Sequence, residues 1–175
     1  MRLFLAVRLP PGVVEHLDRA MQGARSLAPP EVRWVDPARW HLTLAFYGEV
    51  PDDRVDRLRA KVTRQVRGTG PLDLRLRAAG RFGDRVMWVG VGGRDRDELR
   101  RLGTAVSVED RPYRPHLTVA RVRGCADLRP LVAALGDYEG PGWTATQLVL
   151  VRSRLGPRPM YDDVASWPLA RRPGA

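Results

Sequence analysis

Cysteine, lysine and histidine are scarce in this sequence. Its 175 residues include one cysteine, one lysine and three histidines. Cys125 cannot form a disulfide within the chain, and no set of Cys and His has the spacing of a metal site. A phosphate-binding loop of the Gly-x-x-x-x-Gly-Lys type and a cluster of carboxylates are missing as well. We therefore predict no metal and no nucleotide cofactor, and a structural or incidental role for Cys125.

Long apolar runs are also missing. No stretch approaches the ~20 residues of a membrane-spanning helix. Residues 1–10 are too few and alternate too regularly for a signal peptide. Because 43% of the residues are hydrophobic, we expect residues 1–175 to form a single globular domain. We expect it to be a cytoplasmic monomer without a membrane partner.

Charge is abundant but of one dominant sign. The net charge is +10, and Lys61 is the single lysine among 30 basic residues. Clustered cations attract phosphates, so this excess is typical of proteins with an anionic partner such as nucleic acid. An abundance of Arg, Gly, Pro and Ala also reflects the coding bias of GC-rich genomes. Both explanations of the charge therefore stay open.

One phrase occurs twice: His41-Leu42-Thr43-Leu44-Ala45 returns as His116-Leu117-Thr118-Val119-Ala120, 75 positions later (116 − 41). With three His and seven Thr in the chain, two His-x-Thr triplets would arise by chance with odds of roughly half a percent. Apolar residues alternate in both phrases, which indicates β-strands. Side chains two apart in a strand share a face, so each strand presents an imidazole beside a hydroxyl.

The apolar pattern divides the remaining sequence into short strands and helices. We expect strands at residues 2–9, 32–35, 72–77, 86–91, 143–151 and 160–167, and helices at 11–27, 51–66, 95–106 and 127–135. The run 86–91 is apolar enough to predict a strand buried on both faces. The order strand, helix, His-x-Thr strand, helix occurs once in each half. This order predicts two similar α+β lobes, each contributing one histidine to a cleft between them.

Two imidazoles at one site suit the chemistry of a phosphodiester. One neutral histidine takes a proton from the attacking nucleophile, and one protonated histidine gives a proton to the leaving oxygen. Thr43 and Thr118 would donate hydrogen bonds to the phosphate oxygens. This chemistry needs no metal and predicts a bell-shaped pH dependence. The two halves are nearly equivalent, so the pattern does not say which histidine, His41 or His116, is the acid.

Several motifs together resemble one family. They are Arg2-Leu3-Phe4-Leu5-Ala6-Val7, Arg33-Trp34-Val35 leading to His41 through Val50, Arg114-Pro115-His116 through Arg121, and Leu150-Val151-Arg152-Ser153-Arg154-Leu155. The chain resembles the two-histidine (2H) phosphoesterases, specifically the bacterial and archaeal RNA 2′,3′-cyclic phosphodiesterases, also called 2′-5′ RNA ligases.

The resemblance implies a fold and an activity. The fold would be α+β and bilobal, with two pseudo-symmetric antiparallel sheets, helices on the outside and the active-site cleft between intertwined lobes. The activity would be hydrolysis of RNA 2′,3′-cyclic phosphate ends to a 2′-phosphate, together with ATP-independent 2′-5′ ligation. His41 would be the proton donor and His116 the proton acceptor. Thr43 and Thr118 are the residues we predict to bind substrate, and Arg121 is a further candidate. Partners would be RNA ends carrying a cyclic phosphate, including tRNA fragments.

Other polar and aromatic residues have two interpretations each. Phe46 and Arg121 follow the two histidines by five positions, and strand alternation places them on the opposite face unless a bulge intervenes. Core packing is favoured for Phe46, whereas phosphate binding and a structural ion pair are both open for Arg121. Trp34 and Trp40 suit base stacking or, more commonly, burial. His16 lies in a predicted helix without a neighbouring Thr, which indicates a surface histidine.

Two alternative functions remain at this stage. The same enzyme chemistry would serve a small cyclic phosphate, such as ADP-ribose cyclic phosphate. A non-catalytic RNA-binding module would use the arginine-rich surface without turnover, although binding alone does not require two titratable imidazoles. We also expect the tail, residues 171–175, to be disordered.

Overall fold

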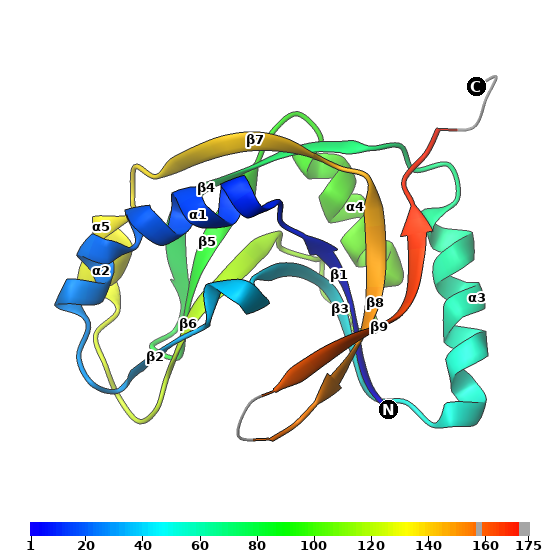
Figure 1. Cartoon of the computed structure of the whole chain (residues 1–175), viewed down its shortest axis with the longest axis horizontal. Helices are drawn as coiled ribbons and strands as arrows, with labels where there is room; N and C mark the ends of the chain where they lie inside the picture. The colour runs from blue at the N-terminus through cyan, green and yellow to red at the C-terminus, as the bar shows by residue number, and fades with distance from the viewer. Residues whose placement is uncertain (157–158, 172–175) are drawn as a thin grey trace.

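The strands of the protein form two antiparallel sheets (Figure 1). The computed structural model describes residues 1–156 and 159–171, so residues 172–175 of the predicted disordered tail lie outside the described residues. The four-stranded sheet has the order β3 (His41–Glu49), β1 (Arg2–Arg8), β8 (Gln147–Arg154), β9 (Met160–Pro168). The five-stranded sheet has the order β2 (Val32–Trp34), β6 (His116–Val122), β5 (Val86–Gly92), β4 (Leu72–Phe82), β7 (Glu139–Ala145).

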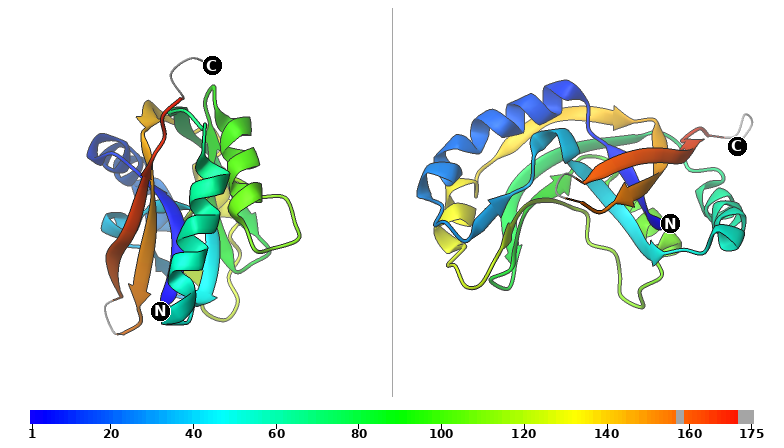
Figure 2. Two further views of the ribbon diagram at one scale, coloured as in Figure 1. Left: turned by 90° about the vertical axis from the view of Figure 1, so that its right-hand side faces the viewer. Right: turned by 60° about the horizontal axis from the view of Figure 1, so that its bottom comes forward.

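The helices lie on the outer sides of these sheets. They are α1 (Pro11–Ala20), α2 (Gln22–Leu27), α3 (Val55–Val66), α4 (Arg96–Val106) and α5 (Arg129–Ala134), with 3-10 turns η1 (Pro37–Arg39) and η2 (Asp52–Arg54). The sheets curve into an arch with α1 on its convex side, and α3 lies beside α4 (Figure 2). The single helix predicted over 11–27 is interrupted at Met21, whose side chain is buried. No helix in the described ranges is both long and apolar enough to cross a bilayer.

The two lobes exchange strands, which confirms the α+β fold with two antiparallel sheets and shows that each lobe draws on both halves of the sequence. The strand predicted over 143–151 is wrong, because the chain passes from one sheet to the other at Thr146. Leu169 donates a backbone hydrogen bond of 2.8 Å to the Thr146 carbonyl at this crossing. Apolar residues continue on both sides of Thr146 without Gly or Pro, so the sequence carries no turn signal there.

One face of each sheet packs into a shared core. In β1, Leu3, Leu5 and Val7 are buried in this core as the alternation predicts, and Phe4 and Ala6 are also buried, in a second cluster with Val149 and Val151. The strand β5 differs from its prediction, because it is not buried on both faces. Its residues 87, 89 and 91 are buried, whereas 86, 88 and 90 are half-buried on the other face. That second face lies on the same side of the sheet as the His116 side chain, because Gly90 is the cross-strand neighbour of His116.

Candidate active site

The two histidine strands meet where the two sheets come together. His41 is the first residue of β3 and His116 is the first residue of β6, and these strands contact one another across the sheets. A hydrogen bond of 2.8 Å from the Val35 amide to the Val119 carbonyl ties the approach to β3 onto β6. The fold thus brings together two phrases that are 75 residues apart in the sequence.

Each imidazole is held by an equivalent hydrogen bond to a backbone carbonyl. Nδ1 of His41 lies 2.7 Å from the carbonyl oxygen of Arg39, and Nδ1 of His116 lies 2.6 Å from that of Arg114. A carbonyl oxygen only accepts, so Nδ1 of each ring carries a proton and donates it. Nε2 is then the nitrogen of each ring that is left to exchange a proton with a substrate.

Aromatic rings surround each histidine. Phe4 stacks on His41 with ring centroids 4.7 Å apart, and Tyr161 meets His41 edge-on at 5.6 Å. Phe82 meets His116 edge-on at 5.0 Å. These contacts fix the ring planes and reduce access of water to the imidazoles.

Burial lowers the pKa of both histidines. For His41 the loss of hydration is the largest cause; the hydrogen bond to the Arg39 carbonyl opposes it, and the charge of Arg8 adds to it. For His116 burial is again the largest cause, and the charge of Arg121 contributes to the lowering. Both rings therefore favour the neutral form in the free protein. A bound phosphate anion would raise the pKa of either ring and favour its protonation.

A bulge interrupts β3 just after its histidine. Ala6 of β1 lies opposite Thr43, and the preceding residue Leu5 lies opposite Ala45, so Leu44 is an extra residue. Thr43 stays on the same face as the histidine two positions before it. Beyond the bulge the alternation resumes with its sense reversed.

A matching bulge interrupts β6. Trp88 of β5 lies opposite Thr118, and the preceding residue Met87 lies opposite Ala120, so Val119 is the extra residue. The two histidine strands thus carry these bulges at equivalent positions, and β3 has a further register shift at Tyr47. We call the side of each sheet that bears the His-x-Thr side chains the histidine face.

The bulges bring Phe46 and Arg121 onto the histidine face, so the expectation that they point away from the histidines is wrong. Phe46 pairs with Phe4, whose ring stacks on His41, and Arg121 pairs with Val86, two residues from Trp88. Phe46 is 44% exposed, which also contradicts core packing for this side chain. The guanidinium of Arg2 lies 4.7 Å from the centre of its ring.

Arg121 is exposed, and within the described ranges no carboxylate lies within 4.0 Å of it. A structural ion pair therefore has no partner among those residues. Arg121 thus presents an unneutralised guanidinium on the histidine face, close enough to influence the titration of His116. A guanidinium in this position suits the oxygens of a phosphate.

The other aromatic and histidine candidates lie elsewhere. Trp40 is 5% exposed and its Nε1 donates to the Val35 carbonyl at 3.1 Å. Trp34 pairs with Ala120 and packs against the core, away from the histidine face. His16 is exposed on α1, where Nδ1 forms a hydrogen bond of 3.0 Å with the Tyr138 hydroxyl.

Four aromatic neighbours of the histidines were not identified from the sequence. Phe4 belongs to β1, the strand next to β3, and Tyr161 belongs to β9, the third strand away in the same sheet. Phe82 and Trp88 belong to β4 and β5. Arg8 is the cross-strand neighbour of His41, and Phe4 lies at a regular strand spacing from Arg8. This spacing indicates that Phe4 lies near His41, but only once the pairing of β1 with β3 is known. Arg8 in turn forms an ion pair with Asp163 of β9.

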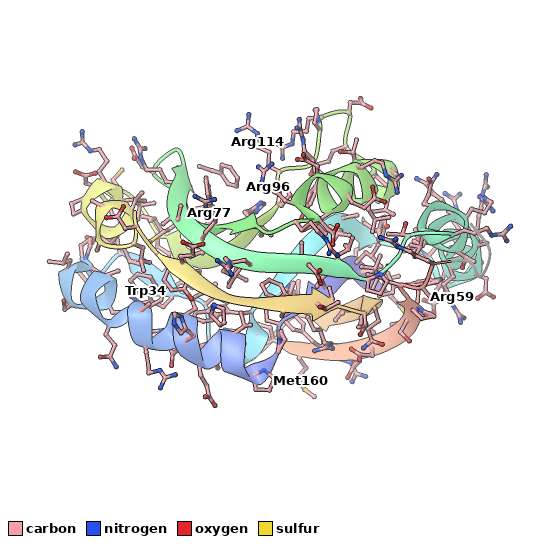
Figure 3. All side chains as sticks on the ribbon, turned by 90° about the horizontal axis from the view of Figure 1, so that it is seen from above. Trp34, Arg59, Arg77, Arg96, Arg114 and Met160 are labelled. Atoms are coloured by element: carbon pink, nitrogen blue, oxygen red, sulfur yellow. The ribbon has the colours of Figure 1, made fainter. Side chains whose placement is uncertain are left out.

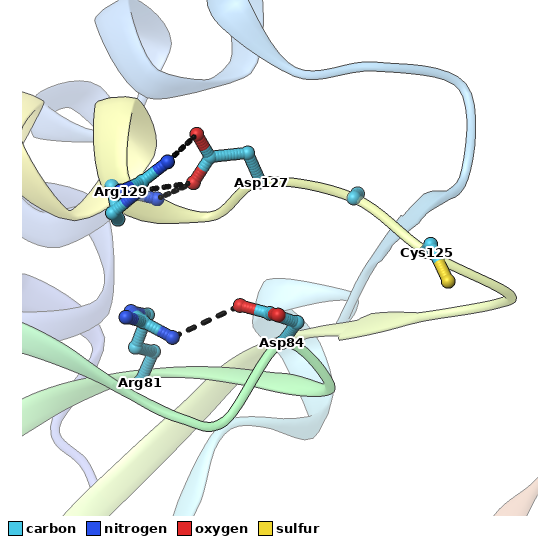
Figure 4. A pocket seen from close by; sticks show the side chains of 6 residues that line it. Arg81, Asp84, Cys125, Asp127 and Arg129 are labelled. Atoms are coloured by element: carbon cyan, nitrogen blue, oxygen red, sulfur yellow. Dashed lines mark hydrogen bonds and ion pairs between the residues drawn. The ribbon is translucent and has the colours of Figure 1, made fainter.

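A separate pocket of about 550 Å³ lies at the turn between β4 and β5 (Figure 4). Its charges neutralise each other, since Arg81 pairs with Asp84 at 2.9 Å and Arg129 pairs with Asp127 at 2.9 Å. The Arg129 guanidinium lowers the pKa of Asp127 to about 2. Cys125 lines this pocket, and neither His41 nor His116 does. In the part of the chain that the structure describes, no three His, Cys, Asp or Glu side chains gather as a metal site would require.

Known proteins are similar to this chain in sequence and in fold. A model of the 2′-5′ RNA ligase superfamily matches residues 13–157. An RNA 2′,3′-cyclic phosphodiesterase of Methanothermobacter thermautotrophicus is 33% identical, over 94% of this chain and 96% of the relative. One of Thermus thermophilus is 32% identical, over 97% of this chain and 90% of the relative. The crystal structure of E. coli LigT complexed with 3′-AMP superimposes with a TM-score of 0.76 at 26% identity, covering 97% of this chain and 98% of that one.

Proposed function

Because the chain belongs to the 2′-5′ RNA ligase superfamily, we propose that it hydrolyses the 2′,3′-cyclic phosphate at the end of an RNA to a 2′-phosphate. The observation that carries the proposal is the matched setting of His41 and His116. Each imidazole opens a strand, donates Nδ1–H to the carbonyl two residues earlier, and leaves Nε2 for the substrate. The relatives named RNA 2′,3′-cyclic phosphodiesterase support the same activity.

The proposed reaction uses the two rings in opposite senses. His116 Nε2 takes a proton from water as the water oxygen bonds to phosphorus. The bond from phosphorus to the 3′ oxygen breaks, and His41 gives its Nε2 proton to that oxygen. The hydroxyls of Thr43 and Thr118 and the guanidinium of Arg121 stabilise the charge that develops on the non-bridging oxygens. Proton exchange with solvent then restores both rings.

The protonation states follow from the site and its substrate. Both histidines have lowered pKa values, so His116 is ready to act as a base in the free protein. His41 must be protonated when it acts, and the negative charge of the bound phosphate favours that form. The assignment of acid to His41 and base to His116 follows the family pattern, and the near symmetry of the two settings is compatible with it.

The proposal extends to ligation and to the biological form of the protein. If the 5′-hydroxyl of a second RNA takes the place of water, the same proton transfers run in the sense of 2′-5′ bond formation without ATP. RNA ends that carry a cyclic phosphate, such as tRNA fragments, are the proposed partners, and the proposed active form is a monomer of one domain. A purely RNA-binding role would not require two imidazoles held by identical hydrogen bonds.

Hydrolysis of an oligonucleotide ending in a 2′,3′-cyclic phosphate tests the proposal. The wild type, His41→Ala, His116→Ala and His16→Ala are compared in the presence of a chelator. Loss of either site histidine removes general acid or base catalysis, so kcat should fall by about 10²–10⁴-fold. The exposed His16 is the matched control, and its variant should keep wild-type activity. Full activity of His41→Ala or His116→Ala would overturn the assignment.

A further inference from the structure

The histidine face of the five-stranded sheet continues beyond His116 to an arginine. Gly90 of β5 is the cross-strand neighbour of His116, and Arg77 of β4 is the cross-strand neighbour of Gly90. The three residues therefore share one face, and two strand spacings separate the backbones of His116 and Arg77, about 10 Å. In Figure 3, Arg77 lies on the same side of the molecule as Arg96 and Arg114.

Between Trp88 and Arg77, the residues on this face of the sheet are glycines, which have no side chain. We call Gly80, Gly90 and Gly92 the glycine strip. A Cβ on Gly80 would lie 2.2 Å from Cζ2 of Trp88, and one on Gly92 would lie 2.6 Å from Cδ of Arg77. The indole of Trp88 thus covers Gly80, and the stem of Arg77 lies across Gly92. Both side chains lie over the strip because no Cβ displaces them.

A bulge keeps Arg77 on this face. Ala78 lies between Arg77 and Ala79 at a register shift and has a φ of 56°, a conformation that is costly for a residue with a Cβ. Its amide donates to the Tyr138 carbonyl at 2.7 Å, which holds the bulge in place. As a result Arg77 and Gly80, three positions apart, both lie on the histidine face.

The charge of Arg77 remains available, while its neighbours are neutralised. Nη1 of Arg75 donates to Glu139 at 2.5 Å, and Nη2 of Arg94 lies 2.6 Å from Asp73. Glu139 is the cross-strand neighbour of Arg77 on β7, but it is bound by Arg75. Within the described ranges no carboxylate lies within 4.0 Å of the Arg77 guanidinium. Arg77 lines a pocket of about 340 Å³ together with these paired residues.

We propose that Arg77, whose stem lies across the glycine strip, binds the sugar–phosphate backbone of the RNA nucleotides adjoining the phosphate that reacts at His41 and His116. A guanidinium pairs well with a phosphodiester, and basic side chains are what the backbone of a single-stranded nucleic acid follows. The inference rests on the proposed function and makes it more specific. It distinguishes an RNA strand from a nucleoside cyclic monophosphate, whose single phosphate would be held at the histidines, two strand spacings from the backbone of Arg77.

Binding measurements test this subsite without turnover. The probe is a fluorescent single-stranded RNA of several nucleotides with a terminal 3′-phosphate, followed by anisotropy between 50 and 200 mM salt. Arg77→Ala should weaken binding roughly three- to tenfold. It should also reduce the slope of log affinity against log salt by about 0.7, the value for one phosphate contact on a single strand. Arg77→Lys should keep most of the slope, since it keeps the charge.

Arg129→Ala is the matched control, because it removes one exposed arginine from the separate pocket at the β4–β5 turn. Its affinity and salt slope should equal those of the wild type. If Arg77→Ala matches the wild type in both quantities, or if Arg129→Ala loses as much, Arg77 is not a specific contact and the inference fails. Equal thermal unfolding of both variants checks that the exposed substitutions leave the fold intact.

A kinetic comparison separates this inference from the proposed function. The substrates are a nucleoside 2′,3′-cyclic monophosphate and an oligonucleotide with the same terminal nucleotide. The wild type should have the higher kcat/KM on the oligonucleotide, and Arg77→Ala should reduce that preference. If the wild type hydrolyses neither substrate, the proposed function fails, while the anisotropy result still decides whether Arg77 binds RNA. Equal loss on both substrates would instead contradict an extended subsite.

Discussion

The composition of the histidine face depends on an extra residue at the equivalent position of each histidine strand, Leu44 in β3 and Val119 in β6. Without these bulges, strict alternation would turn Phe46 and Arg121 into the core. The bulges leave the histidine and threonine of each strand in place and rotate the residue that follows onto the same side. The guanidinium of Arg121 thereby lies on the same face as His116, and the ring of Phe46 lies on the same face as His41.

Arg121 provides a prediction that separates charge from structure. Its positive charge lowers the pKa of His116, so Arg121→Ala should raise that pKa. Because His116 must be neutral to act as a base, the acidic limb of kcat/KM against pH should move to higher pH. Loss of a charged hydrogen bond to phosphate should also lower kcat/KM by roughly ten- to a hundredfold. Arg121→Lys keeps the charge, so its limb should stay near the wild-type position; a shift in both variants would argue against this origin.

Among the helices, α4 sets the approach to His116. Gly103 lies in its interior, and the helix continues to Val106. The ring of Tyr113 packs directly on Gly103, where a Cβ would lie 2.1 Å from its Cδ1. The Tyr113 amide also donates to Oγ1 of Thr104 at 3.0 Å. Tyr113 therefore holds the segment before His116 against α4. Its ring can pack at this position of the helix only because residue 103 is a glycine.

Gly103→Ala should consequently destabilise the protein although alanine favours helices. The overpacked ring costs about 1–3 kcal/mol, more than the gain of about 1 kcal/mol in helix propensity. Displacement of Tyr113 should also lower kcat/KM, since His116 follows it by three positions. Urea unfolding and steady-state kinetics measure the two effects.

Gly12→Ala in α1 is the internal comparison for this substitution, because nothing lies within 4 Å of the added Cβ. It should leave stability unchanged or raise it by up to about 1 kcal/mol. A loss of stability of the same size in both variants would show that the Tyr113 contact is not the cause of the Gly103→Ala effect.

In the molecule as a whole, two sheets that exchange strands hold the histidines in partly buried positions. The chain leaves the five-stranded sheet after β7 and enters the four-stranded sheet with β8, so neither lobe is complete without both halves of the sequence. Burial between aromatic rings makes each imidazole harder to protonate than in the unfolded chain, where the pKa is about 6.5. Folding and protonation of the site therefore oppose one another.

The pH dependence of stability follows from that opposition. As the pH falls below about 6.5, the unfolded chain takes up protons that His41 and His116 resist in the folded state, so the free energy of unfolding should decrease. Carboxylates with a lowered pKa, such as Asp127, titrate below about pH 4 and lie outside this window. Urea unfolding between pH 7.5 and 5 measures the slope. The double variant His41→Gln/His116→Gln should show a flatter profile, and an unchanged slope would contradict the burial of these rings.

Much of this organisation is readable from the order of residues alone. The pairing of imidazole and hydroxyl on two strands, the apolar stripes of the helices and the alternation of β1 follow from periods of two and 3.6 residues. These periods depend only on neighbours along the chain. For that reason His41, Thr43, His116 and Thr118 could be singled out without coordinates, and the two-lobed α+β fold could be predicted.

The remaining features required the folded chain, because they depend on how distant segments pair. The register between β1 and β3, and between β5 and β6, sets the bulges that place Phe46 and Arg121. The chain crosses from one sheet to the other at Thr146 without a local turn signal. The crossing is determined by the pairing of β7 in the five-stranded sheet and of β8 in the four-stranded sheet. Arg77 lies beside Gly90 only through pairing of β4 with β5. Contacts between residues far apart in sequence are formed by packing, and no local period encodes them.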